Sequence, residues 1–403
     1  MSVPALRFKQ DDGQDFPEWQ EKPFKDVSKI NQGLQIPISD RFAEGGENRH
    51  FYITNEFLRK DAKNQYFIEN PPSSVLCSES DVLMTRTGNT GKVVTNVKGA
   101  FHNNFFKISY DRNILIKDFL CEFLCLEHTQ SLILKLAGTS TIPDLNHSDF
   151  YKIKFRFPSL PEQTKIANFL TAVDEKISLL TQKHDLLSQY KKGVMQKIFS
   201  QELRFKDVDG NDFPEWKEKL VSEVFNDFKG TGLSKDKIGE VGKNKCILYG
   251  HLFTRYSEVI TDIESRTDFE EGLISEAGDI LIPSSTTTKG IDLAKASSLN
   301  QSGVLLGGDI IVLRLKEKGN SNFFAYLLTH AKSKDIAEIT QGITIIHLYF
   351  SQLKNILLNC PCEKEQTKIA NFLSAIDDKI TATQTQLQAV KQYKQGLLQQ
   401  MFV

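Results

Sequence analysis

Several features that would assign this 403-residue sequence to a class are scarce or absent. Its six cysteines form no CxxC pair and no histidine sits at zinc-finger spacing, so we expect free thiols in a reducing compartment. No window of about 18 apolar residues occurs, which argues against a transmembrane helix. The first residues, MSVPALRFKQDDG, lack the apolar core of a signal peptide. We therefore expect a cytoplasmic protein.

A strong charge of either sign is also lacking. The chain has 50 Lys and Arg against 51 Asp and Glu, which gives a net charge of −1. A lone DNA-binding domain is usually basic. Global charge therefore gives no support to a nucleic-acid function, and any such function must be inferred from local features.

The common catalytic signatures are missing as well. The sequence contains no GxxxxGK[ST], HExxH or GxSxG pattern. Asn70-Pro71-Pro72 resembles the start of an amino-methyltransferase motif, but Ser73 stands where the base-stacking aromatic belongs. No glycine-rich cofactor loop precedes it, so a proline turn between strands is the favoured interpretation. We predict no catalytic residue, no resident metal and no cofactor in this chain.

The sequence is instead a duplication. EQTKIANFL fills 162–170 and recurs identically at 365–373, and LRFKQDDGQDFPEW at 6–19 is matched by LRFKDVDGNDFPEW at 203–216. Between these kept segments the two copies diverge, which suits one scaffold that presents two different surfaces. The predicted segments are a conserved start at 1–22, a variable domain at 23–158, a long helix at 159–202, the repeated LRFK–FPEW segment at 203–219, a second variable domain at 220–360 and a second long helix at 361–403. Each variable domain is predicted to be α/β, with a mixed or antiparallel sheet and short helices.

Each long helix carries a heptad seam of apolar residues. The seam is interrupted at His184, Lys191, Thr383 and Lys394. At 1.5 Å per residue, about 38 residues give a rod of roughly 57 Å. Two rods in one chain can pair antiparallel, which would place the variable domains at opposite ends; a coil that only dimerises the protein is the alternative. The seam residues are Ile166, Leu170, Val173, Ile177, Leu180 and Leu187 in the first helix, and Ile369, Leu373, Ile376, Ile380, Leu387 and Val390 in the second.

One local feature favours a nucleic-acid-binding function. It is a polar, glycine-rich loop at matching places in both copies. No acidic residue occurs between Val82 and Tyr110, and Asp292 is the only one between Ile280 and Gly308. Hydroxyl and amide groups bond phosphates or base edges, and Arg can grip guanine. The candidates are Thr85, Arg86, Thr87, Asn89, Thr90 and Lys92 in the first copy, and Ser284, Ser285, Thr286, Thr287 and Lys289 in the second.

The loop before each long helix supplies a second group of candidates. These are Thr139, Ser140 and Thr141 in the first copy, and Gln341, Thr344 and His347 in the second. His102, Asn103 and Asn104 are weaker candidates, because FHNNFF is also typical of a strand-edge turn.

Together these segments resemble the specificity subunit of a type I restriction–modification system. The matching features are the two LPEQTKIANFL-like helices, the GDILI-type strand with its glycine turn, and the G-[ST]-T…L…SDF segment before the helix. The resemblance implies that each variable region is a target recognition domain for one half of a bipartite, asymmetric DNA sequence, and that the helices form an antiparallel coiled coil that sets the gap. The second copy departs from the pattern, since Ser284 or Ser285 stands near the place of Arg86 and GTST has become GITI.

The same resemblance implies double-stranded DNA and several subunits as partners. Two modification subunits would carry S-adenosylmethionine and methylate adenine N6, and restriction subunits would use ATP and Mg²⁺. The chain itself would be non-catalytic and associated with the nucleoid of a bacterium. Two alternatives stay open: a stand-alone adenine-N6 methyltransferase acting through Asn70-Pro71-Pro72, and a coiled-coil scaffold with no DNA role.

Overall fold

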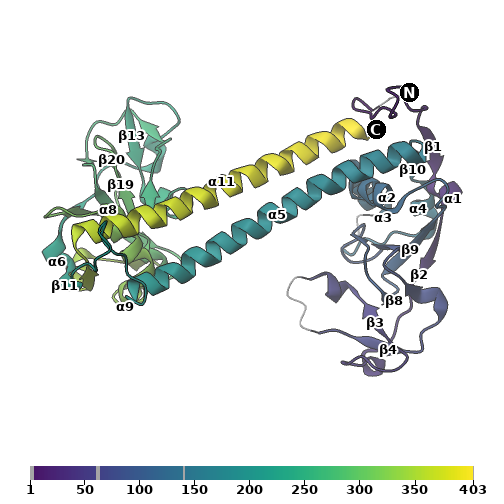
Figure 1. The fold of residues 1–403 in the computed structure, drawn as a ribbon, viewed down its shortest axis with the longest axis horizontal. Helices are drawn as coiled ribbons and strands as arrows, with labels where there is room; N and C mark the ends of the chain where they lie inside the picture. Colours follow the sequence, from purple (N-terminus) through teal and green to yellow (C-terminus); the bar gives the residue numbers. More distant parts are fainter. Residues whose placement is uncertain (1–3, 60–63, 139–140, 403) are drawn as a thin grey trace. The chain divides into compact units, whose positions relative to one another are not determined.

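The computed structural model describes residues 4–59, 64–138 and 141–402. It divides into two units, Met1–Leu180 with Gln386–Val403, and Thr181–Thr385. Two long helices, α5 (Leu160–Phe199) and α11 (Glu363–Met401), each contribute residues to both units (Figure 1). Neither they nor any other described helix is long and apolar enough to cross a membrane.

The described residues of the first unit form two four-stranded sheets and one two-stranded ladder. The strand orders are β2-β9-β6-β7, β4-β3-β8-β5 and β1-β10, and all neighbours are antiparallel except β3 and β8. The strands are β1 (Gln20–Pro23), β2 (Ser28–Gln32), β3 (Arg49–Ile53), β4 (Phe67–Glu69), β5 (Leu76–Cys77), β6 (Val82–Thr85), β7 (Val93–Val94), β8 (Gly99–Phe101), β9 (Phe105–Tyr110) and β10 (Lys154–Phe157).

Short helices connect these strands, as the sequence predicted. They are α1 (Phe24–Val27), α2 (Lys117–Cys125), α3 (Glu127–Ala137) and α4 (His147–Lys152), with 3₁₀ turns at Ile38–Asp40, Asn55–Leu58 and Ser73–Val75. The segment Asn70-Pro71-Pro72 lies in the turn between β4 and β5.

The second unit repeats this plan with additions. Its strand orders are β12-β21-β17-β19-β14, β15-β13-β20-β16, β11-β23 and β18-β22, with parallel pairs at β13–β20 and β14–β19. The strands are β11 (Lys217–Leu220), β12 (Phe225–Lys229), β13 (Asn244–Ile247), β14 (Val259–Ile260), β15 (Arg266–Thr267), β16 (Leu273–Ile274), β17 (Asp279–Pro283), β18 (Ser285–Thr286), β19 (Ser297–Leu299), β20 (Leu305–Leu306), β21 (Ile310–Leu315), β22 (Ile346–His347) and β23 (Leu357–Cys360). The helices are α6 (Val221–Val224), α7 (Tyr249–Thr254), α8 (Ser321–Tyr326), a π-helical turn at Leu327–Ala331, α9 (Ser333–Glu338) and α10 (Phe350–Leu353), with 3₁₀ turns at Lys235–Lys237 and Gly290–Ala294.

The central strands β6 and β17 have apolar side chains at successive positions because both faces of each strand are covered. Val82 and Met84 pack in one hydrophobic cluster, whereas Leu83, which points to the opposite face, packs in another. In the second unit Ile280 and Leu281 divide between two clusters in the same way. A strand covered on both faces needs apolar side chains at every position, so the period-2 alternation disappears.

Within each unit, the segments of the two long helices pack antiparallel. In the first unit Ile166 and Leu170, near the start of α5, share a hydrophobic cluster with Leu397 and Met401, near the end of α11. In the second unit the roles are exchanged, and the start of α11 packs with the end of α5. All the seam residues named above are buried or half-buried. Thr383 is also in the seam and buried, and its hydroxyl donates to the carbonyl of Lys379 at 2.7 Å.

The two repeated motifs bind each other. Arg7 donates from Nε and Nη2 to the carboxylate of Glu162, at 3.0 and 2.6 Å, and Glu162 is fully buried. Arg204 and Glu365 form the same fork in the second unit, at 3.2 and 2.7 Å. A buried carboxylate must be paired. The faithful repetition of EQTKIANFL is therefore linked to the faithful repetition of LRFK.

Candidate nucleic-acid interface

The glycine-rich loop after β6 is clamped by two other segments. The amide of Arg86 donates to the carbonyl of Asn104 at 2.7 Å, and the carbonyl of Arg86 accepts from the amide of Leu145 at 3.0 Å. Thr87 and Asp144 form an isolated antiparallel bridge beside it. The two candidate loops of the first unit, which are distant in sequence, therefore lie against each other.

The second unit contains the same clamp with different side chains. The amide of Ser284 donates to the carbonyl of Asp309 at 2.8 Å, and its carbonyl accepts from the amide of Leu348 at 2.9 Å. Here the neighbouring bridge has grown into a short ladder, in which β18 pairs with β22 and Ser285 faces His347. The backbone thus holds Arg86 and Ser284 in equivalent places while their side chains differ.

Arg86 and Asp144 form a forked ion pair. Nε donates to Oδ1 at 3.0 Å and Nη2 donates to Oδ2 at 2.6 Å, and the Thr87 hydroxyl donates to the same carboxylate. Burial raises the pKa of Asp144, but the hydrogen bonds from Thr87 and Arg86 outweigh it and leave the pKa below its usual range. Asp144 therefore stays ionised at neutral pH.

Two of the predicted hydroxyls serve the loop itself. Thr85 is fully buried and donates to the carbonyl of Asn89, and Thr90 donates to the carbonyl of Pro143 at 2.7 Å. Asn89 has a φ of 58°, which places it in the left-handed region that asparagine tolerates. Asn89 and Lys92 are exposed, so they and the half-buried Arg86 and Thr87 are the candidates that reach the surface.

In the second unit the exposed candidates are further along the loop. Ser285 and Thr286 are buried in the β18 ladder, whereas Thr287 and Lys289 are exposed. Ser284 is half-buried. Thr286 and Thr288 share a hydroxyl–hydroxyl hydrogen bond at 2.9 Å, which keeps the loop compact.

The candidates that precede the long helices are partly described. Thr139 and Ser140 lie outside the described residues, and Thr141 is exposed. Gln341 and His347 exchange two backbone hydrogen bonds, at 2.9 and 2.6 Å, which close a hairpin with the exposed Thr344 at its tip. The side chains of His347 and Tyr349 stack with ring centroids 5.8 Å apart.

The weaker candidates belong to the turn between β8 and β9. The amide of Asn104 donates to Nδ1 of His102 at 3.1 Å, and Asn103 donates to the side chain of Gln35 at 3.1 Å. This turn supports the interface indirectly, because the carbonyl of Asn104 holds the amide of Arg86.

Some residues at these loops were not predicted from the sequence. Asp144 is one, and a cavity of about 900 Å³ beside the second loop adds Tyr249, Lys295 and Asp309. The sequence offers one signal for Asp144, which is its alignment with the predicted site residue His347. Asp144 directly precedes Leu145 and His347 directly precedes Leu348, the leucines whose amides bind the carbonyls of Arg86 and Ser284.

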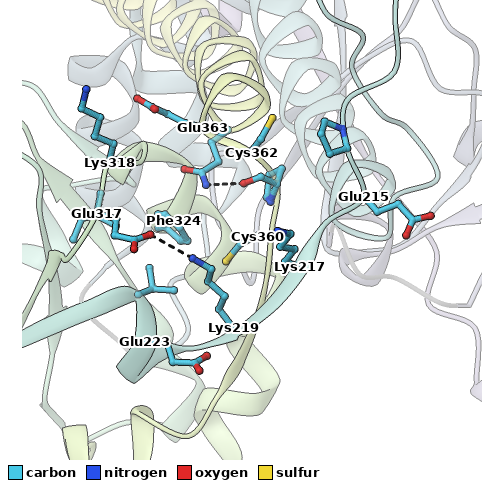
Figure 2. A pocket seen from close by; sticks show the side chains of 15 residues that line it. Glu215, Lys217, Lys219, Glu223, Glu317, Lys318, Phe324, Cys360, Cys362 and Glu363 are labelled. Atoms are coloured by element: carbon cyan, nitrogen blue, oxygen red, sulfur yellow. Dashed lines mark hydrogen bonds and ion pairs between the residues drawn. The ribbon is translucent and has the colours of Figure 1, made fainter.

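A second depression, of about 310 Å³, lies away from these loops, where β11, β23 and the first turn of α11 meet (Figure 2). Lys219 and Glu317 pair across it at 3.6 Å, and Gln366 donates to the carbonyl of Pro361 at 2.9 Å. Burial raises the pKa of the Cys360 thiol to about 11, so it stays protonated at neutral pH. All six cysteines are free thiols, and the described residues contain no His, Cys, Asp and Glu cluster of three or more that could hold a metal.

Comparison with known proteins gives one consistent result. Residues 17–189 and 214–392 match the family described as type I restriction modification DNA specificity domain. The type I restriction enzyme MjaVIII specificity subunit of Methanocaldococcus jannaschii is 23% identical over 97% of this chain and 94% of its own length. The MjaIX specificity subunit of the same organism is 24% identical over 71% of this chain and 69% of its own.

Solved structures agree on the fold. The S subunit of a type I restriction–modification system from M. genitalium superposes with a TM-score of 0.65 at 18% identity, covering 100% of this chain and 99% of that one. A chain from a study of complex assembly and conformational transition of a type I system gives 0.53 at 15% identity, over 96% and 98% of the two chains. The chain therefore belongs to the family of type I restriction–modification specificity subunits.

Proposed function

We propose that this chain is the non-catalytic DNA-reading subunit of its complex, and that each unit reads one half of a bipartite, asymmetric DNA site. One observation carries the proposal. Both units hold the same loop by the same backbone clamp, yet the clamped residue is Arg86 in one unit and Ser284 in the other. A common frame with different side chains suits two readers of two different half-sites.

The surface for contact consists of the loop side chains that are not buried. In the first unit these are Arg86, Thr87, Asn89, Lys92 and Thr141, with Thr139 and Ser140 retained as predictions. In the second unit they are Ser284, Thr287, Lys289, Gln341, Thr344 and His347. Thr85, Thr90, Ser285 and Thr286 support these loops through the hydrogen bonds or burial described above.

The predicted boundaries, 23–158 and 220–360, define the two recognition domains of the proposal. The test is to exchange residues 23–158 for those of a homologue and to map methylated adenines across the genome of cells that express the chain with its modification subunits. We expect one half of the methylated sequence to change and the other half to persist. An unchanged sequence would favour a scaffold without a DNA role.

The helix pair is proposed to set the spacer between the half-sites and to dock two modification subunits. The lengths support this role, because a helix of 40 residues is about 60 Å long at 1.5 Å per residue. DNA half-sites one turn apart are separated by about 34–36 Å. Inserting four residues into both α5 and α11 should lengthen the spacer in the methylated sequence, and an unaltered spacer would contradict the proposal.

The partners and cofactors of the complex remain part of the proposal. Modification subunits would supply S-adenosylmethionine, and restriction subunits would supply ATP-driven, Mg²⁺-dependent steps. Binding of S-adenosylmethionine by the purified chain alone would instead favour the stand-alone methyltransferase. A gel shift with and without modification subunits, at two salt concentrations, measures how the phosphate contacts are divided between this chain and those subunits. Each phosphate contact makes the DNA-binding affinity fall more steeply with salt.

A further inference from the structure

The guanidinium of Arg86 is fixed along one edge. Its Nε and Nη2 donate to the two carboxylate oxygens of Asp144, which is held in turn by the Thr87 hydroxyl. The guanidinium carbon also lies 5.6 Å from the centre of the Phe106 ring. A side chain held on one edge and near an aromatic face keeps one orientation without a ligand.

The adjacent edge of the guanidinium, formed by Nη1 and the second N–H of Nη2, keeps its donors. A guanidinium has five N–H groups in a rigid, planar arrangement, and Asp144 takes one from Nε and one from Nη2. Across the described residues, no acceptor is hydrogen-bonded to Nη1. The side chains of Arg86 and Asp144 are 18% and 47% exposed, so the pair reaches the protein surface.

The free edge has the geometry of one particular base contact. Two parallel N–H groups of an arginine match the O6 and N7 acceptors of guanine in the major groove, whereas adenine presents a donor where guanine presents O6. We propose that Arg86 reads a guanine in the half-site of the first unit, with Asp144 and Thr87 as its positioning residues. This inference rests on the proposed function of the loops in DNA reading.

Asp144 also argues against a phosphate as the ligand of Arg86. A carboxylate beside the guanidinium offsets its positive charge and repels the DNA backbone, so the pair is a poor electrostatic grip. The directional donors of the free edge are unaffected by that offset. A balanced ion pair therefore favours a neutral, bidentate acceptor such as a base edge.

The second unit lacks this device. Ser284 occupies the clamp in place of Arg86, Ser285 faces His347 in the ladder, and neither serine brings a cation. The Arg86 contact is therefore assigned to one half-site only, which agrees with an asymmetric target.

The test uses the complex of this chain with its modification subunits. Methylated adenines are mapped genome-wide for the wild type, Arg86→Ala, Arg86→Lys, Asp144→Asn and the control Arg112→Ala, which changes an exposed arginine of the same unit outside the loops. We expect Arg86→Ala and Arg86→Lys to lose about tenfold or more of the preference at a single G·C position. Asp144→Asn should weaken the preference at that same position by a smaller factor. The other half-site and the control should match the wild type.

Arg86→Lys keeps the charge and length but lacks the fork, so it separates base reading from folding, and Asp144→Asn keeps the shape of the loop. A wild-type preference retained at every position by both arginine variants would overturn the inference and leave the proposed function intact. Loss at a position other than G·C would also overturn it. A wild-type complex without sequence preference would overturn the proposed function itself.

Discussion

The ammonium of Lys394 lies 2.7 Å from the carboxylate of Asp174, and the repeat reproduces the pair, with Lys191 2.7 Å from Asp377. Both lysines stand at seam positions where the heptad pattern is interrupted. Each also contacts a glutamate of the variable domain in its own unit, Lys394 at 3.3 Å and Lys191 at 3.3 Å. The two lysines are therefore points where the variable domain of each unit is attached to the long helices.

Removing one of these lysines should destabilise its unit. Lys394→Met leaves Asp174 and Glu122 without their cation, and because the site is only half-buried we expect a loss of about 1–2 kcal/mol in the free energy of unfolding. Urea denaturation measures it. A cycle with Lys394→Met, Asp174→Asn and the double variant should give a coupling energy of at least about 0.5 kcal/mol, and additive losses would contradict the pairing.

The fork between the repeated motifs should matter more. Arg204→Ala leaves the fully buried carboxylate of Glu365 without its cation, and we expect a loss of about 3 kcal/mol in unfolding free energy. The matched control is Asp11→Asn, which removes the partner of Lys165 at a fully exposed site and should leave the urea midpoint unchanged. Equal effects of the two substitutions would be inconsistent with burial as the cause.

Stability should depend on acid through Glu258. Burial raises its pKa, but the hydrogen bond from His330 and the charge of Lys191 outweigh it and lower the pKa from 4.5 to about 2. A carboxyl group whose pKa is lower in the folded state stabilises the fold above its unfolded pKa. That stability, about 3 kcal/mol, is lost as the pH falls from about 4.5 towards 2.

Glu258→Gln should remove most of this acid-dependent loss when thermal unfolding is followed between pH 5 and 2. Lys295 and Asp377 belong to the same charged environment, and both are unchanged in this variant. Glu317→Gln is the control. Because Glu317 is largely exposed, this substitution should not change the loss of stability between pH 5 and 2. If the loss of stability between pH 5 and 2 persists in Glu258→Gln, Glu258 is not its cause.

A close backbone approach makes Gly230 sensitive to substitution. A Cβ at this position would lie 1.9 Å from the carbonyl oxygen of Gly307, and a backbone atom cannot move aside as a flexible side chain does. We expect Gly230→Ala to cost about 3 kcal/mol or more in calorimetric unfolding. Gly250→Ala, in α7 with nothing within 4 Å, should be neutral or stabilising by up to about 1 kcal/mol.

The sequence predicted the features that depend on residues close together in the chain or on repeated segments. A period of seven is visible within one helix, and identical segments reveal a duplication, so the helices, the seam and the repeated α/β units were predicted. The bond between Arg86 and Asp144 was not, because the two residues are 58 positions apart and nothing local says which loops meet. Thr85 shows a second limit: its place in a polar loop predicts a ligand contact, and the sequence does not reveal that its hydroxyl donates to the carbonyl of Asn89 within the same loop.

The amide of Leu203 donates to the carbonyl of Lys197 at 3.0 Å, just after α5 ends, and the equivalent amide of Leu6 donates to the carbonyl of Gln400 at 3.0 Å. The first bond closes a continuous turn, whereas the second joins the two termini of the chain (Figure 1). The same backbone hydrogen bond therefore forms once within a continuous stretch of chain and once between segments near its two ends. A circular permutant, joined from Phe402 to Leu6 and opened near Gln201, should therefore keep both of these contacts.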